Sequence, residues 1–123
     1  MRRQPERAEQ ANIVRLLKSV GATTYVLGTT RRKGDYHGTM MSAGLPDVLA
    51  FTPTPRSMCL LAIEVKAPGG RLRPEQRTFR DLCALASVDH IVGGLDAVTD
   101  WLIARGVLRD RHTRALTQDK RAE

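Results

Sequence analysis

The feature that most constrains the fold is an aliphatic run, Met58 to Lys66, with two charges near its end. Aliphatic and β-branched residues in a short run predict a β-strand. Because side chains alternate along a strand, one face carries Leu60, Ala62, Glu64 and Lys66, and the other carries Leu61, Ile63 and Val65. Charged groups are rarely buried unless they are paired or bind a metal. A carboxylate and an ammonium therefore project side by side at the end of an otherwise apolar strand.

Six further elements are predicted from apolar periodicity and turn residues. They are a helix from Pro5 to Val20, strands from Thr23 to Leu27 and from Pro46 to Phe51, a helix from Pro74 to Ser87, a short strand from His90 to Val92, and a helix from Leu95 that ends at Gly106. The order αβββαβα predicts an α/β domain whose mixed sheet is flanked by helices.

One domain is expected over residues 1–108, followed by a polar, basic tail over 109–123 that we expect to be frayed. Residues 28–44 have no apolar period, and a loop of this length is usually functional or mobile. The apolar fraction of 41% is sufficient for one core, to which Cys59, Cys83 and Trp101 are assigned. The charged N-terminus and the short apolar runs predict a soluble, intracellular protein without a membrane span.

The net charge is +7, from 20 basic and 13 acidic residues. A basic surface is typical of nucleic-acid-binding proteins, because phosphate neutralisation releases counterions. A cationic but otherwise ordinary surface explains the same number. The charge balance leaves both interpretations open.

A second acidic residue, Asp47, begins the strand before the aliphatic run. If the two strands are neighbours, Asp47 and Glu64 converge on one cation, with Lys66 beside it. Mg²⁺ takes oxygen ligands such as carboxylates, water and phosphate, and it activates water for phosphodiester hydrolysis. Taken singly, a Glu-x-Lys pair is most often a solvated salt bridge and Pro46-Asp47 a turn. Together, with apolar strands around both, they favour a hydrolytic site.

Pro46-Asp47 and Glu64-Val65-Lys66 resemble the two half-motifs of the PD-(D/E)xK nuclease superfamily. With 63–72 and Gln76, the chain resembles its VRR-NUC (virus-type replication-repair nuclease) family over roughly residues 5–103. The resemblance implies a DNA endonuclease that depends on Mg²⁺, for which Mn²⁺ substitutes, and no small-molecule cofactor. The implied metal ligands are Asp47, Glu64 and the Val65 backbone carbonyl.

The resemblance also implies two supporting residues. A glutamine on the helix after the Glu-x-Lys strand falls on Gln76, which shares a helix face with Phe79 and Cys83 and therefore points inward. A glutamate on the first helix completes the metal site. Both Glu6 and Glu9 are able to face the core by helical spacing, and the family's spacing favours Glu6. Arg73-Pro74 stands where a serine or threonine helix cap is common.

Basic residues flank this predicted site on both sides in the sequence. We expect them to contact DNA phosphates, although each alone is equally well explained as solvated surface charge; they are Arg31, Arg32, Lys33, Arg71, Arg73, Arg77 and Arg80.

The resemblance implies cleavage of branched DNA, four-way junctions or flaps, by a homodimer in the cytoplasm of a bacterial or phage-infected cell, during replication, recombination or repair. Two alternatives stay open at this point. One is a DNA-binding module that keeps the nuclease fold without its chemistry, and the other is a small assembly protein. The carboxylates favour the enzyme, because simple phosphate binding requires no acidic group.

Overall fold

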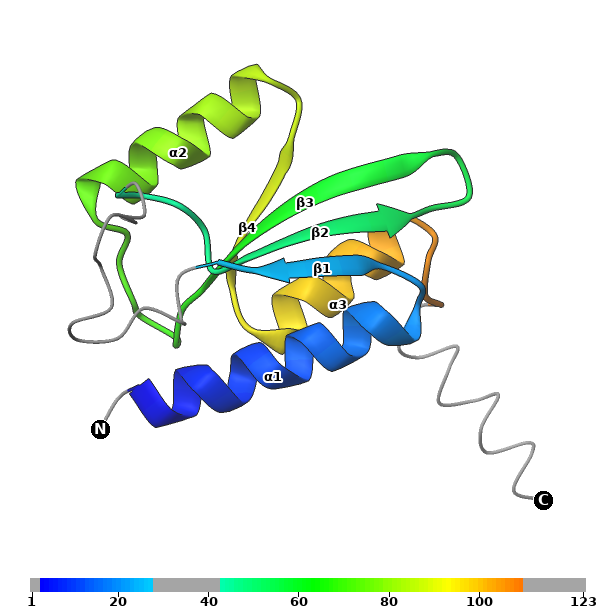
Figure 1. Cartoon of the computed structure of the whole chain (residues 1–123), viewed down its shortest axis with the longest axis horizontal. Helices are drawn as coiled ribbons and strands as arrows, with labels where there is room; N and C mark the ends of the chain where they lie inside the picture. The colour runs from blue at the N-terminus through cyan, green and yellow to red at the C-terminus, as the bar shows by residue number, and fades with distance from the viewer. Residues whose placement is uncertain (1–2, 28–42, 110–123) are drawn as a thin grey trace, which may run out of the picture.

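The computed structural model describes residues 3–27 and 43–109. A four-stranded sheet lies between helices on its two faces (Figure 1). The elements are α1 (Arg3–Ser19), β1 (Thr23–Val26), β2 (Val48–Pro53), β3 (Met58–Val65), α2 (Pro74–Leu85), β4 (Asp89–Gly93) and α3 (Leu95–Ala104). All seven predicted elements are present in the predicted order, so the fold-class prediction is confirmed.

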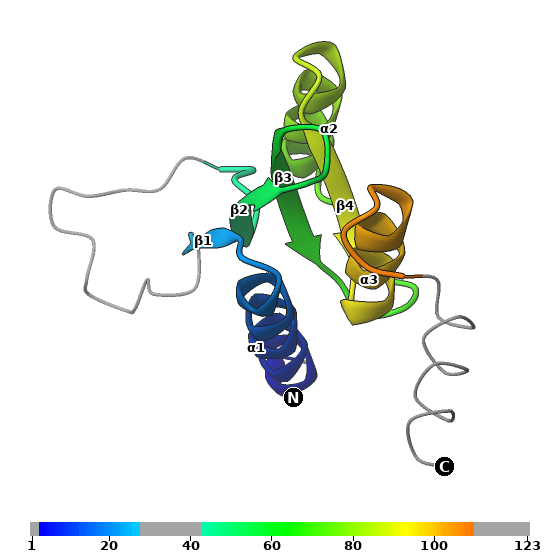
Figure 2. The ribbon, with the colours of Figure 1, turned by 90° about the vertical axis from the view of Figure 1, so that its right-hand side faces the viewer.

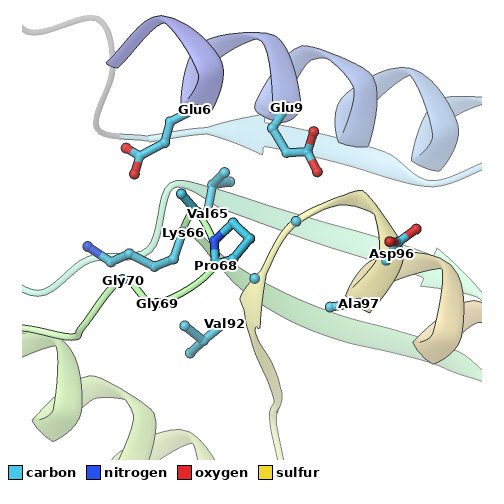
Figure 3. Close-up of a pocket in the computed structure, with 13 residues that line it drawn as sticks. Glu6, Glu9, Val65, Lys66, Pro68, Gly69, Gly70, Val92, Asp96 and Ala97 are labelled. Carbon is cyan, nitrogen blue, oxygen red and sulfur yellow. The ribbon is translucent and has the colours of Figure 1, made fainter. Parts of the chain in front are cut away.

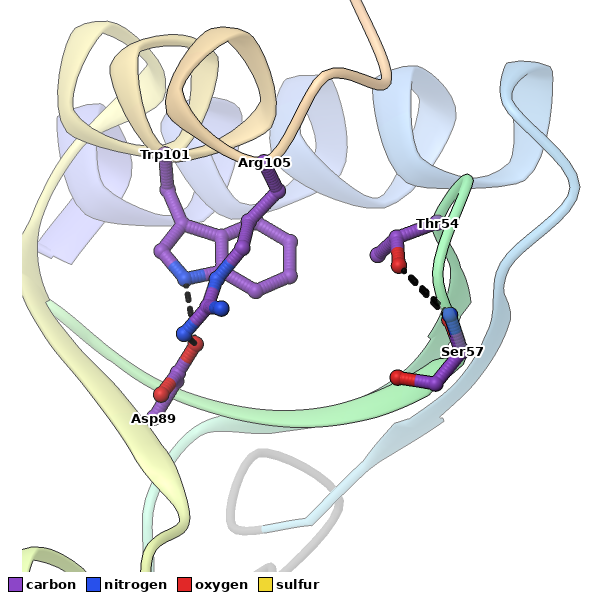
Figure 4. Close-up of polar contacts among 5 residues, drawn as sticks. All are labelled: Thr54, Ser57, Asp89, Trp101 and Arg105. Carbon is purple, nitrogen blue, oxygen red and sulfur yellow. Dashed lines mark hydrogen bonds and ion pairs between the residues drawn. The ribbon is translucent and has the colours of Figure 1, made fainter.

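The strands follow the order β1-β2-β3-β4. The pairs β1–β2 and β2–β3 are antiparallel, whereas β3 and β4 are parallel and are connected through α2. A tight turn joins β2 to β3, in which the Thr54 hydroxyl donates to the Ser57 carbonyl at 2.7 Å (Figure 4). The aliphatic strand β3 therefore has a partner on each side, which explains its apolar composition.

The predicted end of the second strand at Phe51 is wrong by two residues. Thr52 pairs with Cys59 and is fully buried, and Pro53 pairs with Met58 at the end of the strand. The pairing of β2 with β1 stops at Phe51. Pro53 therefore lies where no β1 residue needs a hydrogen bond from it, and its lack of an N–H is tolerated there.

Figure 2 shows α1 and α3 on one face of the sheet and α2 on the other. The main core lies under α1 and α3; it contains Ile13, Leu17, Val98 and Leu102 from the helices and Val48, Ala50, Leu61, Ile63 and Val65 from the strands. On the opposite face α2 covers β4, where the rings of Phe79 and His90 lie 6.0 Å apart. Residues of β3 from Leu61 to Val65 are therefore buried on both faces.

Three core assignments have mixed outcomes. Cys83 is buried as predicted, but Cys59 and Trp101 are only partly buried. Trp101 packs against the core and directs its polar edge outward, where Nε1 donates to Asp89 at 2.8 Å and the Arg105 guanidinium lies over the ring (Figure 4). An indole N–H needs such a partner, which keeps Trp101 at the margin of the core.

The predicted loop over most of residues 28–44 and the tail beyond Arg109 lie outside the described residues. Among the helices that the structure describes, none is long and apolar enough to cross a membrane.

Candidate active site

Asp47 and Glu64 lie side by side at one end of the sheet. Val48 pairs with Ile63, and the Asp47 N–H donates to the Ile63 carbonyl at 3.0 Å, so Asp47 is the next residue along from that pair, beside Glu64. Neighbouring residues of antiparallel strands on one face have closely spaced side chains. The two carboxyl groups are close enough for the Asp47 charge to raise the pKa of Glu64, and Oδ2 of Asp47 accepts the Val65 N–H at 2.8 Å. The predicted convergence of these two acids is present.

The turn that leads into Asp47 depends on Gly44. Its φ of +92° lies in the left-handed region, and a Cβ on it would stand 2.4 Å from the Glu75 carbonyl oxygen in the first turn of α2. Pro46 follows and is buried, and the Asp47 carbonyl accepts the Leu27 N–H at 2.8 Å. The segment from Gly44 to Asp47 thus packs closely against α2, and this packing positions Asp47 beside the end of β3.

Glu64 is a buried acid in an unfavourable electrostatic environment. Its side chain is 4% exposed. Burial and then the neighbouring Asp47 charge raise the pKa of Glu64 from 4.5 to about 8, although Lys66 and Arg73 oppose the shift. Without a cation, the pair therefore retains one proton at neutral pH. A divalent cation would replace that proton, and the hard oxygen donors present are those that Mg²⁺ prefers.

Gln76 holds Glu64 from the other side. Its Nε2 donates to Oε2 of Glu64 at 2.8 Å, and its Oε1 accepts the Arg73 N–H at 2.8 Å. Because the carbonyl oxygen is occupied by Arg73, the amide has to present its N–H to Glu64. By accepting the N–H of Arg73, the N-cap residue of α2, Gln76 supplies the N3 half of a capping box, whereas Arg73 makes no side-chain cap bond. The inward orientation predicted for Gln76 is present.

Lys66 follows β3 directly, where a turn supports its side chain. The turn runs from Ala67 to Gly70, with Gly70 N–H donating to the Ala67 carbonyl at 2.9 Å and Gly69 at a φ of +83°. A Cβ on Gly70 would lie 3.4 Å from Cβ and Cδ of Lys66, so the lysine stem packs along the bare backbone. The Lys66 N–H also donates to the Gly93 carbonyl at 3.0 Å.

A cavity of about 490 Å³ opens between α1, the turn after Lys66 and the start of α3. Glu6 and Glu9 both line it, and Figure 3 shows that they point to different places. Glu6 extends toward the end of the cavity that holds Lys66, whereas Glu9 extends toward the β4–α3 connection. There Oε2 of Glu9 accepts the Leu95 N–H at 2.7 Å. Glu9 thus makes a hydrogen bond that joins α1 to the start of α3.

Asp47 and Glu64 are not among the residues that line this cavity. Within residues 3–27 and 43–109, no three Asp, Glu, His or Cys side chains come close enough together to hold an ion. A cation at Asp47 and Glu64 would therefore need a non-carboxylate donor, or a movement of Glu6.

The family comparison agrees with this geometry. Residues 6–93, which contain Asp47, Glu64, Lys66 and Gln76, match the VRR-NUC domain family. The chain belongs to the VRR-NUC family. It is accordingly a nuclease-type, DNA-processing domain.

A solved structure described as a VRR-NUC domain has the same fold, with a TM-score of 0.58 and 22% sequence identity. The alignment covers 80% of this chain and 94% of that one. Comparison with curated proteins returned no match.

Four of the basic residues predicted to contact DNA lie just before α2 or along it in this VRR-NUC domain. Arg71, Arg73, Arg77 and Arg80 are all exposed. Arg77 donates to the Leu72 carbonyl, and Arg80 pairs with Asp81 at 3.1 Å. The other three, Arg31, Arg32 and Lys33, lie outside the described residues.

Sequence reasoning assigned no role to several glycines that shape the VRR-NUC site. Gly44, Gly70 and Gly94 each leave room for a neighbouring group, namely the Glu75 carbonyl, the Lys66 stem and the Glu9 carboxylate. Gly44 lies three residues before Asp47 and Gly70 four residues after Lys66, and this closeness in the sequence was the available signal. The partner of each contact lies elsewhere in the chain or depends on a side-chain rotamer, so the contacts themselves required coordinates.

Proposed function

We propose that this VRR-NUC domain is a DNA endonuclease that hydrolyses phosphodiester bonds with Mg²⁺, for which Mn²⁺ substitutes. One observation carries the proposal: two carboxyl groups from adjoining strands, the buried Glu64 and the partly buried Asp47, lie side by side, with Lys66 two residues beyond Glu64. Two neighbouring carboxylates repel each other when both are ionised, so the pair does not stabilise the fold by itself. A divalent cation bound between them would offset that repulsion.

The residues proposed to hold the metal are Asp47, Glu64, the Val65 backbone carbonyl and Glu6. Asp47 is oriented by its bond to the Val65 N–H, and Glu64 is oriented by Gln76. Glu6 approaches from α1 at the cavity that Val65 and Lys66 also line. A bound Mg²⁺ would polarise the scissile phosphate and lower the pKa of an attacking water.

Lys66 is the residue proposed to act on that water. Its ammonium lies near enough to Glu64 to favour the ionised carboxylate. At the same position it orients a water by hydrogen bonding and offsets negative charge that develops on the phosphate oxygens. Its stem packs against Gly70, which limits the freedom of the ammonium group. Gln76 then keeps Glu64 ionised and correctly turned by donating to its carboxylate.

The proposed DNA contacts follow α2. Arg73, Arg77 and Arg80 are at helical offsets 0, 4 and 7, which gives one flank. The pKa of His90 on β4 is lowered by burial and then by the Arg80 charge, so His90 lies near the Arg80 end of this flank. Together with Arg71 it forms a basic border beside the carboxylates. Such contacts grip phosphates without reading bases.

We therefore propose selectivity for DNA structure, a four-way junction or a flap, rather than for sequence. A two-fold symmetric junction with paired cuts matches two copies of one small domain, so we propose a homodimer as the active form on junctions.

The test uses four-way junction, flap, nicked and linear duplex DNA with wild type, Lys66→Ala and Lys18→Ala. Lys18 is exposed in the last turn of α1 and provides a matched loss of one lysine. We expect Mg²⁺-dependent cutting by wild type and Lys18→Ala that chelator stops. Lys66→Ala is expected to bind DNA without cutting it. Equal cutting by Lys66→Ala would contradict the assignment, and DNA binding by wild type without cutting in Mg²⁺ or Mn²⁺ would support the non-catalytic module.

A further inference from the structure

Glu9 makes a contact that joins two elements distant in the sequence. From the second turn of α1, its Oε2 accepts the N–H of Leu95, the first residue of α3, at 2.7 Å. The residue before it, Gly94, is the N-cap of α3 and has no side chain with which to cap the helix. A carboxylate at a helix N-terminus satisfies an orphan N–H and interacts favourably with the helix dipole. Glu9 thus caps α3 from another helix.

The backbone at Gly94 is shaped for this contact. A Cβ at that position would stand 2.3 Å from Oε2 of Glu9. The Gly94 dihedrals, φ −120° and ψ −156°, are extended and accessible to any residue. A glycine is therefore required here by the space that the carboxylate occupies and not by the backbone conformation.

The Glu9 contact lies next to residues that are paired with the end of β3, the strand that carries Glu64. Val65 pairs with Gly93, and the Lys66 N–H donates to the Gly93 carbonyl at 3.0 Å. The β4–α3 connection, to which Glu9 is hydrogen-bonded, is thus itself hydrogen-bonded to the residues beside the proposed metal site. Glu6 stands three residues before Glu9, on the same side of α1, and lines the same cavity as Val65 and Lys66 (Figure 3).

We propose that Glu9 is a positioning residue: by capping α3 it holds the first turns of α1 against the β4–α3 connection, and so keeps Glu6 at the cavity that Val65 and Lys66 line, from which the Glu6 side chain moves to the metal. The inference rests on the proposed function, because it assigns Glu9 a role in metal binding through Glu6. It separates the two glutamates that sequence spacing left as alternatives. Glu6 contacts the ion, and Glu9 acts on Glu6.

The experiment measures Mg²⁺ affinity by calorimetry, without DNA, for wild type, Glu9→Ala, Glu9→Gln, Glu6→Gln and the double variant Glu6→Gln/Glu9→Ala. We expect Glu9→Ala to weaken Mg²⁺ binding about tenfold, as loss of a supporting residue does at other metal sites. Glu9→Gln keeps an acceptor oxygen and should lie within about threefold of wild type by the same reasoning. In the Glu6→Gln background, Glu9→Ala should cause no further loss, because its effect passes through Glu6.

Gly94→Ala tests the same contact from the other side and covers the case in which Glu9→Ala folds poorly. Its Cβ should displace the Glu9 carboxylate and weaken Mg²⁺ binding, but it should have no effect in a Glu9→Ala background, where the space is open. Asp96→Asn removes an acid from the same cavity without touching the Leu95 bond and should bind Mg²⁺ as wild type does.

Two results would overturn the inference while the proposed function stands: wild-type affinity in Glu9→Ala, or losses from Glu6→Gln and Glu9→Ala that add in full. The second result would make Glu9 an independent ligand. A wild-type protein that binds no Mg²⁺ and cuts no DNA would instead overturn the proposed function, and this inference with it.

Discussion

Replacement of Gln76 by methionine removes one hydrogen-bond donor from the proposed metal site at nearly constant side-chain volume. In the native protein Gln76 is 4% exposed, donates to Oε2 of Glu64 and accepts the Arg73 N–H. A hydrogen bond to a charged group contributes about 1.5–3 kcal/mol. The ionised Glu64 needs that bond, and Mg²⁺ requires the ionised form. We therefore expect Mg²⁺ to bind Gln76→Met roughly 10- to 150-fold more weakly, because about 1.4 kcal/mol corresponds to a factor of ten.

The effect on folding should be smaller than the effect on metal binding. Without metal, the raised pKa of Glu64 keeps a proton on the carboxyl pair at neutral pH, so the lost bond costs less there. Arg73 is exposed, and water can satisfy its N–H, which leaves a cap loss of about 1 kcal/mol.

The assay for Gln76→Met is calorimetric Mg²⁺ titration beside urea unfolding in chelator, with Thr78→Met, an exposed residue of the same helix, as control. A folded Gln76→Met that binds Mg²⁺ within threefold of wild type would refute the reasoning.

Three further predictions concern pH, backbone and DNA. In chelator, the folded protein retains a Glu64 proton that the unfolded chain releases above pH 4.5, so the free energy of unfolding should fall as pH rises from 4.5 to about 8. The expected slope is about 1.4 kcal/mol per pH unit, and it should vanish in Glu64→Gln. Urea titrations that show the same slope in both proteins would contradict this prediction. Gly44→Ala should destabilise the protein more than Gly69→Ala, since both have positive φ but only the first Cβ meets the Glu75 carbonyl; equal melting temperatures would remove the steric argument. Arg77→Ala should weaken binding to all DNA sequences alike and reduce the salt-dependence slope by about 1, as measured by fluorescence anisotropy at several salt concentrations, and an unchanged slope would exclude Arg77 from the interface.

Much of the fold was predictable because its signals are local. The aliphatic composition of Met58–Val65 predicts a strand without any tertiary contact. The helical period of 3.6 residues places Gln76 on the same face as Cys83, and both residues are buried. The closeness of Asp47 and Glu64 could be predicted only if their two strands are neighbours. That condition was reasonable, because strands joined by a short connection usually are neighbours.

Other features depend on tertiary contacts that no local pattern encodes. The exact register beside Asp47 follows from the length of the Thr54–Ser57 turn and from the extension of β2 to Pro53. The bond from Glu9 to Leu95 spans 86 residues, and helical spacing alone left Glu6 and Glu9 equivalent. Only the packing of α1 against α3 distinguishes them.

The central claim is that one divalent ion lies between Asp47 and Glu64. Anomalous diffraction at the manganese edge, from crystals grown with Mn²⁺, tests it most directly. We predict a peak about 2 Å from a carboxylate oxygen of each residue. Bound Mn²⁺ elsewhere in the protein, with no peak between Asp47 and Glu64, would contradict the account.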